Sequence, residues 1–209
     1  MKKLEVIGLV VVLVLVTGIV QRLGRDARTQ QSATAIVENE LAQIKEIAIM
    51  QYPDMPLEDA MSLVANERSE TRMREHSQLN QQVLAAVGFS TFYRANTSAR
   101  AVHCSEAGVD ISPFTSVFQN MHNSELQQTT WIFQASNTDF ERDWLELAPF
   151  AAAWAQQDLQ GIAIHYSTDI AGACQLFAES PDEVAELLTY SSSKPEERRI
   201  LMSYIRDGI

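Results

Sequence analysis

Histidine and cysteine are the side chains of this chain with the widest catalytic and metal-binding chemistry. His103 stands next to Cys104, but a Cys–His nucleophile needs both side chains to meet in space beside a group that orients the histidine. A structural cysteine beside a surface histidine is the simpler interpretation. None of His76, His122 and His165 has the HExxH spacing of a zinc site. The sequence also has no glycine-rich phosphate loop and no GxSxG motif. We therefore expect no enzymatic activity, no cofactor and no metal.

The two cysteines, Cys104 and Cys174, are the only ones in the chain and do not form a CxxC pair. In a cytosolic protein they would be two independent buried thiols. In an exported protein an even count favours one disulfide. Closing a loop of this length would stabilise the fold by about 4 kcal/mol on chain-entropy grounds.

The bulk composition narrows the class of protein. The chain has 209 residues, a net charge of −11 and 46% hydrophobic residues, which predicts one folded domain with a sizeable core. Nucleic-acid binding needs a positive surface, so we expect no nucleic acid as a partner of the acidic head.

Residues 1–20 read MKKLEVIGLVVVLVLVTGIV, an apolar run with one acid, Glu5, near its start. A charge inside a hydrocarbon-bound segment costs about 2.5–3.5 kcal/mol on insertion scales, so an ionised Glu5 needs a partner. The α-amino group of Met1 on a neighbouring subunit would suit. Such a contact repeats without closing and builds a helical filament. If Met1 is the initiator, Glu5 lies at the headgroup level beside Lys2 and Lys3 instead.

Three hypotheses describe the apolar run. It is a cleaved secretory signal, although its cleavage site is poor, or an uncleaved single-pass anchor, or the first half of one long helix over residues 3–50. The third follows from apolar residues that recur every three or four positions up to Ala48. Pro53 and Pro56 end that helix. It divides the chain into an apolar half-helix, residues 1–28, and a head, residues 29–209, that includes an amphipathic half-helix at 29–52.

The rest of the head predicts an α/β (α+β) fold with a small, mainly antiparallel sheet and peripheral helices packed on the long helix. Strand-forming residues gather at 89–93, 129–133 and 161–166. Helical patterns cover 57–87, with Gly88 as its stop, and 139–159, which Pro149 bends or splits. Shorter helical patterns cover 168–177, 181–190 and 195–206. Four side chains on one face of the 139–159 helix form a predicted core, namely Trp144, Leu147, Ala151 and Trp154.

The first fifty residues resemble the start of a mature type IV pilin, most like the type IVb branch. Residues 4–7 read LEVI, a long Val/Leu run follows, and Gln21 and Arg22 lead into a polar helix. In that family the fifth mature residue is a glutamate, which implies an assembly role for Glu5 and an N-methylated amine on Met1. The stretch 161–177 is similar to the family's strand, turn and helix that bears a disulfide cysteine. The resemblance therefore implies a Cys104–Cys174 bridge.

The resemblance implies a structural subunit of a type IV pilus-like filament, or a minor pilin. Its partners would be identical subunits, the bacterial inner membrane before assembly, and the pilus assembly machinery. The extracellular pilus (fimbrium) would carry the head for adhesion, aggregation or transfer. The alternative is a single-pass membrane-anchored exported domain that acts as a binding module in an envelope or secretion complex.

Overall fold

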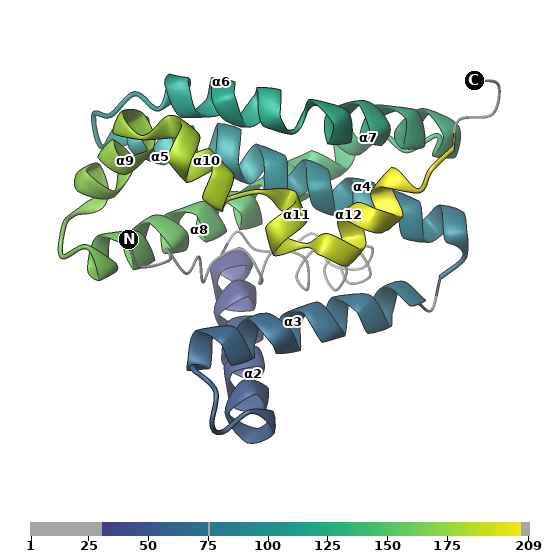
Figure 1. The fold of residues 1–209 in the computed structure, drawn as a ribbon, viewed down its shortest axis with the longest axis horizontal. Coiled ribbons are helices and arrows are strands. Elements are labelled where there is room, and N and C mark those ends of the chain that lie inside the picture. The colour runs from purple at the N-terminus through teal and green to yellow at the C-terminus, as the bar shows by residue number, and fades with distance from the viewer. Residues whose placement is uncertain (1–30, 75, 206–209) are drawn as a thin grey trace.

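The computed structural model describes residues 31–74 and 76–205, and every regular element in these ranges is a helix. In Figure 1, α2 and α3 lie below the other helices, and α2 also packs against α8. We call α2 and α3 the hairpin and the helices from α4 onward the body. The helices are α2 (Gln31–Gln51), α3 (Leu57–Arg74), α4 (Gln78–Arg94), the π-helix η2 (Ala95–Ala99), α5 (Arg100–Glu106), α6 (Ser112–Met121), α7 (Asn123–Ser136), α8 (Phe140–His165), α9 (Ile170–Glu179), α10 (Pro181–Leu187), α11 (Tyr190–Ser193) and α12 (Pro195–Met202).

The predicted α/β fold with an antiparallel sheet is wrong. Residues 89–93 lie inside α4, 129–133 inside α7, and 161–166 at the end of α8. A short run of apolar and β-branched residues does not distinguish a strand from a helix that is buried on most sides. α4 is such a helix, because nine of its residues between 82 and 92 are buried.

Local signals explain where several helices begin. The side chain of Asp139 accepts the backbone N–H of Arg142 at the start of α8, and Asp169 accepts that of Gly172 at the start of α9. Pro occupies an early position of α6, α10 and α12, where its missing N–H leaves no bond unmade. α2 ends at Gln51, in agreement with the stop predicted from Pro53.

α4 continues through Gly88 to Arg94, so the stop predicted there is absent. α8 continues through Pro149 to His165, so Pro149 does not split the helix. Gly88 is buried in the packed middle of α4. Tertiary packing outweighs the local tendency of both residues to end a helix.

The body encloses the larger of two cores. Aromatic side chains dominate it, and α4 packs against α7, α8 and α12. The core predicted along α8 is confirmed, because Leu147, Ala151 and Trp154 are buried and Trp144 packs against them partly buried. The most deeply buried aromatic residues are Phe89, Phe114, Phe118, Trp154, Phe177 and Tyr190.

The amphipathic half-helix predicted at 29–52 corresponds to α2, which packs against α3 and α8. The apolar half-helix predicted at 1–28 lies outside the described residues. Within 31–74 and 76–205, no helix is both long enough and apolar enough to cross a membrane. The expectation of a pilin head on a transmembrane anchor is therefore corrected, because residues 31–74 and 76–205 contain neither a sheet nor a membrane-spanning helix.

Candidate functional site

The structure describes the two cysteines predicted to form a disulfide but not the two residues predicted to act in assembly. Met1 and Glu5 lie outside the described residues, and their proposed pairing stays a prediction. Cys104 and Cys174 form a disulfide that joins α5 to α9, with their Cα atoms 5.5 Å apart. The bridge closes a loop of 70 residues that contains α6, α7 and α8, so it fastens α5 to α9 across three intervening helices.

The Cys–His nucleophile considered from the sequence does not exist. Cys104 has no thiol because it is bridged, and its side chain is fully buried. The Nε2 atom of His103 lies 3.0 Å from the carbonyl oxygen of Ala152, and its Nδ1 atom lies 3.6 Å from a Glu106 oxygen. The contact with Ala152 ties α5 to α8. Cys104 and His103 therefore have structural roles, as the simpler interpretation of the sequence expected.

A buried ion pair lies one helical turn before Cys104. The Nη2 atom of Arg100 is 2.6 Å from Oδ2 of Asp158, and both side chains are almost fully buried. Nη2 also donates to Oδ1 of Asn96 at 3.0 Å. The guanidinium lies over the rings of Trp154 and Phe177, 5.5 and 4.5 Å from their centroids. The π-helix η2 immediately precedes Arg100, and its wider turn re-aims the side chains that follow it.

This pair fixes the packing of η2, α8 and α9 on one another. A buried charge is tolerated only when it is paired, and Asp158 supplies the counter-charge for Arg100. Nε and Nη1 of Arg100 have no hydrogen-bond partner in the described ranges. All the groups that touch the guanidinium belong to the body itself, so we assign the cluster to stability.

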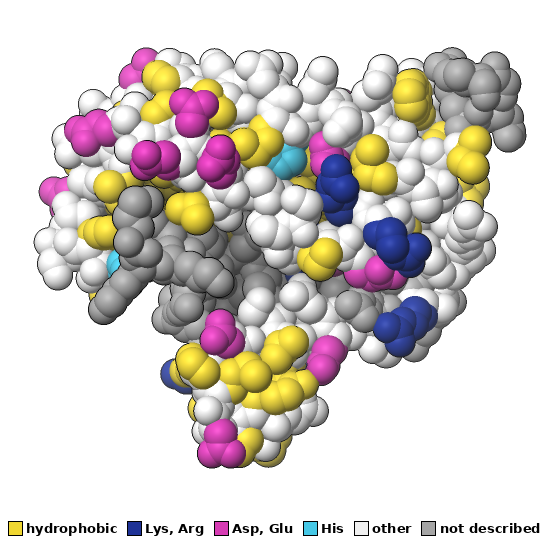
Figure 2. Space-filling view, viewed as in Figure 1, with side chains coloured by type: hydrophobic (Ala, Val, Ile, Leu, Met, Phe, Trp, Pro, Cys, Tyr) yellow, Lys and Arg dark blue, Asp and Glu magenta, His cyan; other side chains and the backbone are white. Residues whose placement is uncertain are grey.

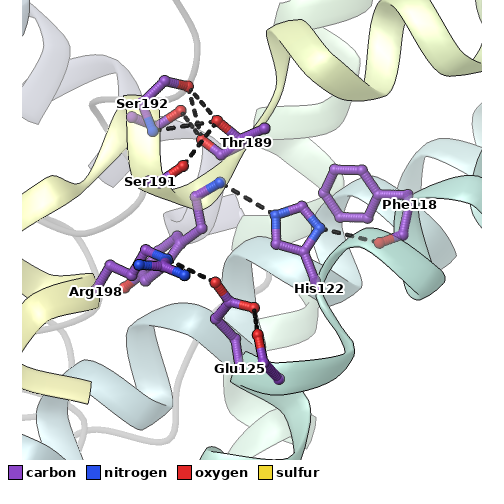
Figure 3. A network of polar contacts seen from close by, with 10 residues as sticks. Phe118, His122, Glu125, Thr189, Ser191, Ser192 and Arg198 are labelled. Carbon is purple, nitrogen blue, oxygen red and sulfur yellow. Dashed lines mark hydrogen bonds and ion pairs between the residues drawn. The ribbon is translucent and has the colours of Figure 1, made fainter. Parts of the chain in front are cut away.

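A second buried polar cluster surrounds His122, where α6 meets α7 (Figure 3). The backbone N–H of Tyr190 donates to Nε2 of His122 at 3.1 Å, and Nδ1 lies 3.0 Å from the carbonyl oxygen of Phe118. Nε2 must therefore be unprotonated, and Nδ1 carries the hydrogen and donates it. Burial is the main cause that lowers the pKa of His122, and the nearby Arg198 lowers it further, against the opposing effects of the Phe118 carbonyl and Glu125.

Glu125 holds the neighbouring part of this cluster. Its carboxylate accepts hydrogen bonds from Nε of Arg198 at 2.7 Å and from the Ser124 hydroxyl at 2.8 Å. Burial acts to raise the pKa of Glu125, but these two hydrogen bonds, a backbone hydrogen bond and the charge of Arg198 together keep the pKa below its usual value. The charge of Glu125 is thus kept, and it anchors α12 to α7.

The cluster continues through buried polar side chains to the hairpin. The Tyr190 hydroxyl donates to Oε2 of Glu197 at 3.0 Å, and Nζ of Lys194 is 3.9 Å from Oε1 of the same residue. Lys194 also donates to Oδ1 of Asn66 on α3 at 3.1 Å. Burial lowers the pKa of Lys194, while Glu197 opposes that shift. A polar path therefore connects α3 with His122.

The central side chains of both clusters, Arg100, Asp158 and His122, are buried. Across residues 31–74 and 76–205, no group of three or more His, Cys, Asp or Glu side chains could hold a metal ion. His122 is enclosed by aromatic rings, with the Phe118 centroid 4.3 Å from its own. Both clusters can fix the positions of the helices that they join.

The hairpin differs from the body in what it exposes. The described residues include thirteen exposed large hydrophobic side chains. Five of them lie in one stretch of fifteen residues in the hairpin, whereas the others are scattered over the body. Figure 2 shows hydrophobic side chains gathered on the hairpin face in view. Scattered apolar side chains are ordinary on a surface, but a local concentration marks a contact site. The five are Ile49, Met50, Met55, Leu57 and Leu63.

Acidic side chains border these apolar residues. Glu46, Asp54, Asp59 and Glu67 are all exposed, and Figure 2 shows acidic groups at the edges of the hydrophobic cluster. Glu67 also accepts the Tyr52 hydroxyl at 2.8 Å, which joins the end of α2 to the middle of α3. We call residues 44–67 the hairpin tip, and it is our candidate functional site: an apolar surface with an acidic border.

Sequence reasoning missed this site because it followed only the apolar stripe on α2 and gave no role to the apolar residues beside it. The stripe is core at Ile44 and Ala48. The signal that could have revealed the tip is the group Ile49, Met50 and Met55, which falls off that stripe next to the Pro53 turn.

Comparison with known proteins adds no assignment. No protein-family model, no curated protein and no solved structure matches this chain. The class that the fold and the candidate site define is a helical, disulfide-bridged protein with an exposed apolar hairpin tip.

Proposed function

We propose that this protein is a non-catalytic structural subunit that associates with further copies of itself through the hairpin tip. The observation that carries the proposal is the concentration of exposed apolar side chains at the tip, such as Met50, which is 73% exposed. Burying such side chains against a partner gains about 25 cal/mol per Å² of apolar surface. Methionine is well suited to this use because its flexible side chain adapts to the surface it meets.

The disulfide indicates the compartment in which the protein would assemble. Bridges of this kind persist where the environment is oxidising, as in exported proteins, and are rare in a reducing cytosol. The Cys104–Cys174 bridge therefore favours an exported protein. The proposed assembly shares one feature with the filament hypothesis, namely that identical subunits associate with one another.

The binding-module hypothesis would use the same surface for a different protein. It is distinguished by whether the purified chain associates by itself. A surface that serves another partner leaves the purified chain monomeric, whereas self-association depends on its concentration.

Sedimentation velocity of the purified full chain over a range of concentrations tests the proposal. The wild-type protein should form larger species as its concentration rises. Replacing Ile49 and Met50 together by serine should leave it monomeric. The matched control replaces Val102 and Ile164, exposed by 56% and 79% on the body, and should behave as wild type. A wild-type chain that stays monomeric, or a control pair with the same effect as the tip pair, would contradict the proposal.

A further inference from the structure

We propose that the hairpin tip of one copy binds residues 1–30 of a second copy of this chain. This inference rests on the proposed self-association and names the segment that the tip recognises. Three observations carry it: the charge of the two segments, their shared apolar character, and the position of the tip relative to the start of α2.

Charge makes the first thirty residues complementary to the tip. Residues 44–67 contain five acidic residues and one lysine. Residues 1–30 contain five basic and two acidic residues, and the basic ones flank the apolar run on both sides. A tip meeting another tip would place like charges together, which costs affinity. The basic flanks of the apolar run instead meet the acidic border of the tip. They are Lys2 and Lys3 before it and Arg22, Arg25 and Arg28 after it.

Apolar character gives the contact its strength. Between the basic flanks, residues 6–20 are almost entirely Val, Leu, Ile and Gly, which matches the exposed Ile, Met and Leu side chains of the tip. Charge pairs at the border of an interface orient the partner and speed its approach, while the buried apolar centre supplies the affinity.

Geometry assigns the segment to a second copy. α2 begins at Gln31, and the tip begins 13 residues later at Ile44, a distance of about 20 Å at 1.5 Å per residue. A chain's own first thirty residues would have to reverse direction and run back along α2 to cover its own tip. The segment of another copy reaches the tip without that reversal. Because the two contacting surfaces differ, the contact is heterologous and can repeat from copy to copy.

Photocrosslinking in the full-length chain tests this inference. A photoreactive amino acid replaces Met55 at the tip, and ¹⁴N- and ¹⁵N-labelled copies are mixed as monomers before they assemble. Mass spectrometry should find crosslinks from position 55 of light copies to peptides of residues 1–30 from heavy copies, and the reverse. The same photoreactive group at Val102, which is exposed on α5, should give no such crosslinks.

A charge exchange makes the test sharper. Asp54→Lys with Asp59→Lys reverses the border of the tip, and Arg22→Glu with Arg25→Glu reverses the flank of the segment. Each variant alone should lose the crosslink between copies. An equal mixture of the two, with the photoreactive group at position 55 of the tip variant only, should regain it, because the reversed tip then meets the reversed segment of the other variant.

The outcomes separate this inference from the proposed function. Crosslinks confined to one isotopic copy, or a mixture that does not regain the crosslink, would overturn the second-copy assignment. Crosslinks between copies that reach another part of the chain would overturn the role of residues 1–30 and leave self-association through the tip standing. A complete lack of crosslinks between copies would overturn both.

Discussion

The hairpin and the body of this protein are built from the same element, the α-helix, but their cores differ greatly. The body buries large aromatic side chains, a disulfide and an internal ion pair. The hairpin core consists of Ile44, Ala48, Ala60, Val64 and Ala65. Alanine buries little surface, so this core stabilises its two helices only weakly, because most of the stability of a helix in a protein comes from tertiary packing.

The difference teaches which region is made for stability and which for contact. The body places its apolar side chains inside, whereas the tip keeps Ile49 and Met50 in solvent. The link between the two regions is narrow and partly polar, through the Lys194–Asn66 hydrogen bond and the packing of α2 on α8. The predictions below should therefore separate effects on the body from effects on the tip.

The largest expected effect comes from removing the disulfide. Replacing Cys104 and Cys174 by serine together should lower the free energy of unfolding by about 4 kcal/mol, because the unfolded chain regains the freedom of a 70-residue loop. Chemical denaturation followed by circular dichroism measures this. A loss below about 1 kcal/mol would mean that the bridge does not fasten the body.

The buried ion pair should have the next largest effect. Asp158→Ala leaves the Arg100 charge buried without its partner and should cost about 3 kcal/mol. The matched control is Glu141→Ala, which removes the largely exposed partner of Arg94 and should cost less than about 1 kcal/mol. Equal losses for the two variants would show that burial does not set the strength of these pairs.

Replacing two glycines of the body by alanine should have smaller effects on stability, of opposite sign at the two positions. A Cβ at Gly172 would lie 1.8 Å from Oγ1 of Thr168, whereas a Cβ at Gly161 meets nothing within 4 Å. Gly172→Ala should therefore destabilise the fold by about 1 kcal/mol, and Gly161→Ala should stabilise it by about 0.5 kcal/mol. Thermal denaturation compares them. A stabilising Gly172→Ala would disprove the close packing at the start of α9.

The pH dependence of stability should report the His122 cluster. Burial lowers the pKa of His122 below 6.5 in the folded protein, so the unfolded chain binds this proton first as the pH falls. The free energy of unfolding should thus decrease below about pH 6.5, with a slope of at most about 1.4 kcal/mol per pH unit for one proton.

Denaturation curves between pH 7.5 and 5.5 measure that slope. His122→Gln should be less stable at pH 7.5 and should have a flatter pH profile than wild type. His165→Gln, which changes an exposed histidine, is the matched control for the substitution. If His122→Gln left the slope unchanged, the proton would be taken up elsewhere.

Local sequence signals predicted much of the helical structure but not the fold class. The stop at Pro53 and the core face of α8 follow from residues close together in the chain. The predicted strand at 89–93 failed because burial around α4 selects the same apolar residues as a strand does.

The polar clusters and the tip could not be predicted for a different reason. The hydrogen bond between His122 and Tyr190 joins residues 68 positions apart, and Lys194 and Asn66 are 128 apart. No local pattern encodes such contacts, because they depend on how the helices pack. The Cys104–Cys174 bridge could be predicted, although the two cysteines are far apart in the sequence, only because the chain has no other cysteine.

Hydrogen exchange of the full chain, measured residue by residue at monomeric and assembling concentrations, tests the contrast between hairpin and body most directly. In the monomer, amides of the hairpin tip should exchange by local opening, much faster than those of α4 and α8. At assembling concentrations the tip amides should slow markedly while the body amides keep their rates. Tip amides that exchange as slowly as those of α4 in the monomer, and that do not respond to concentration, would contradict the account.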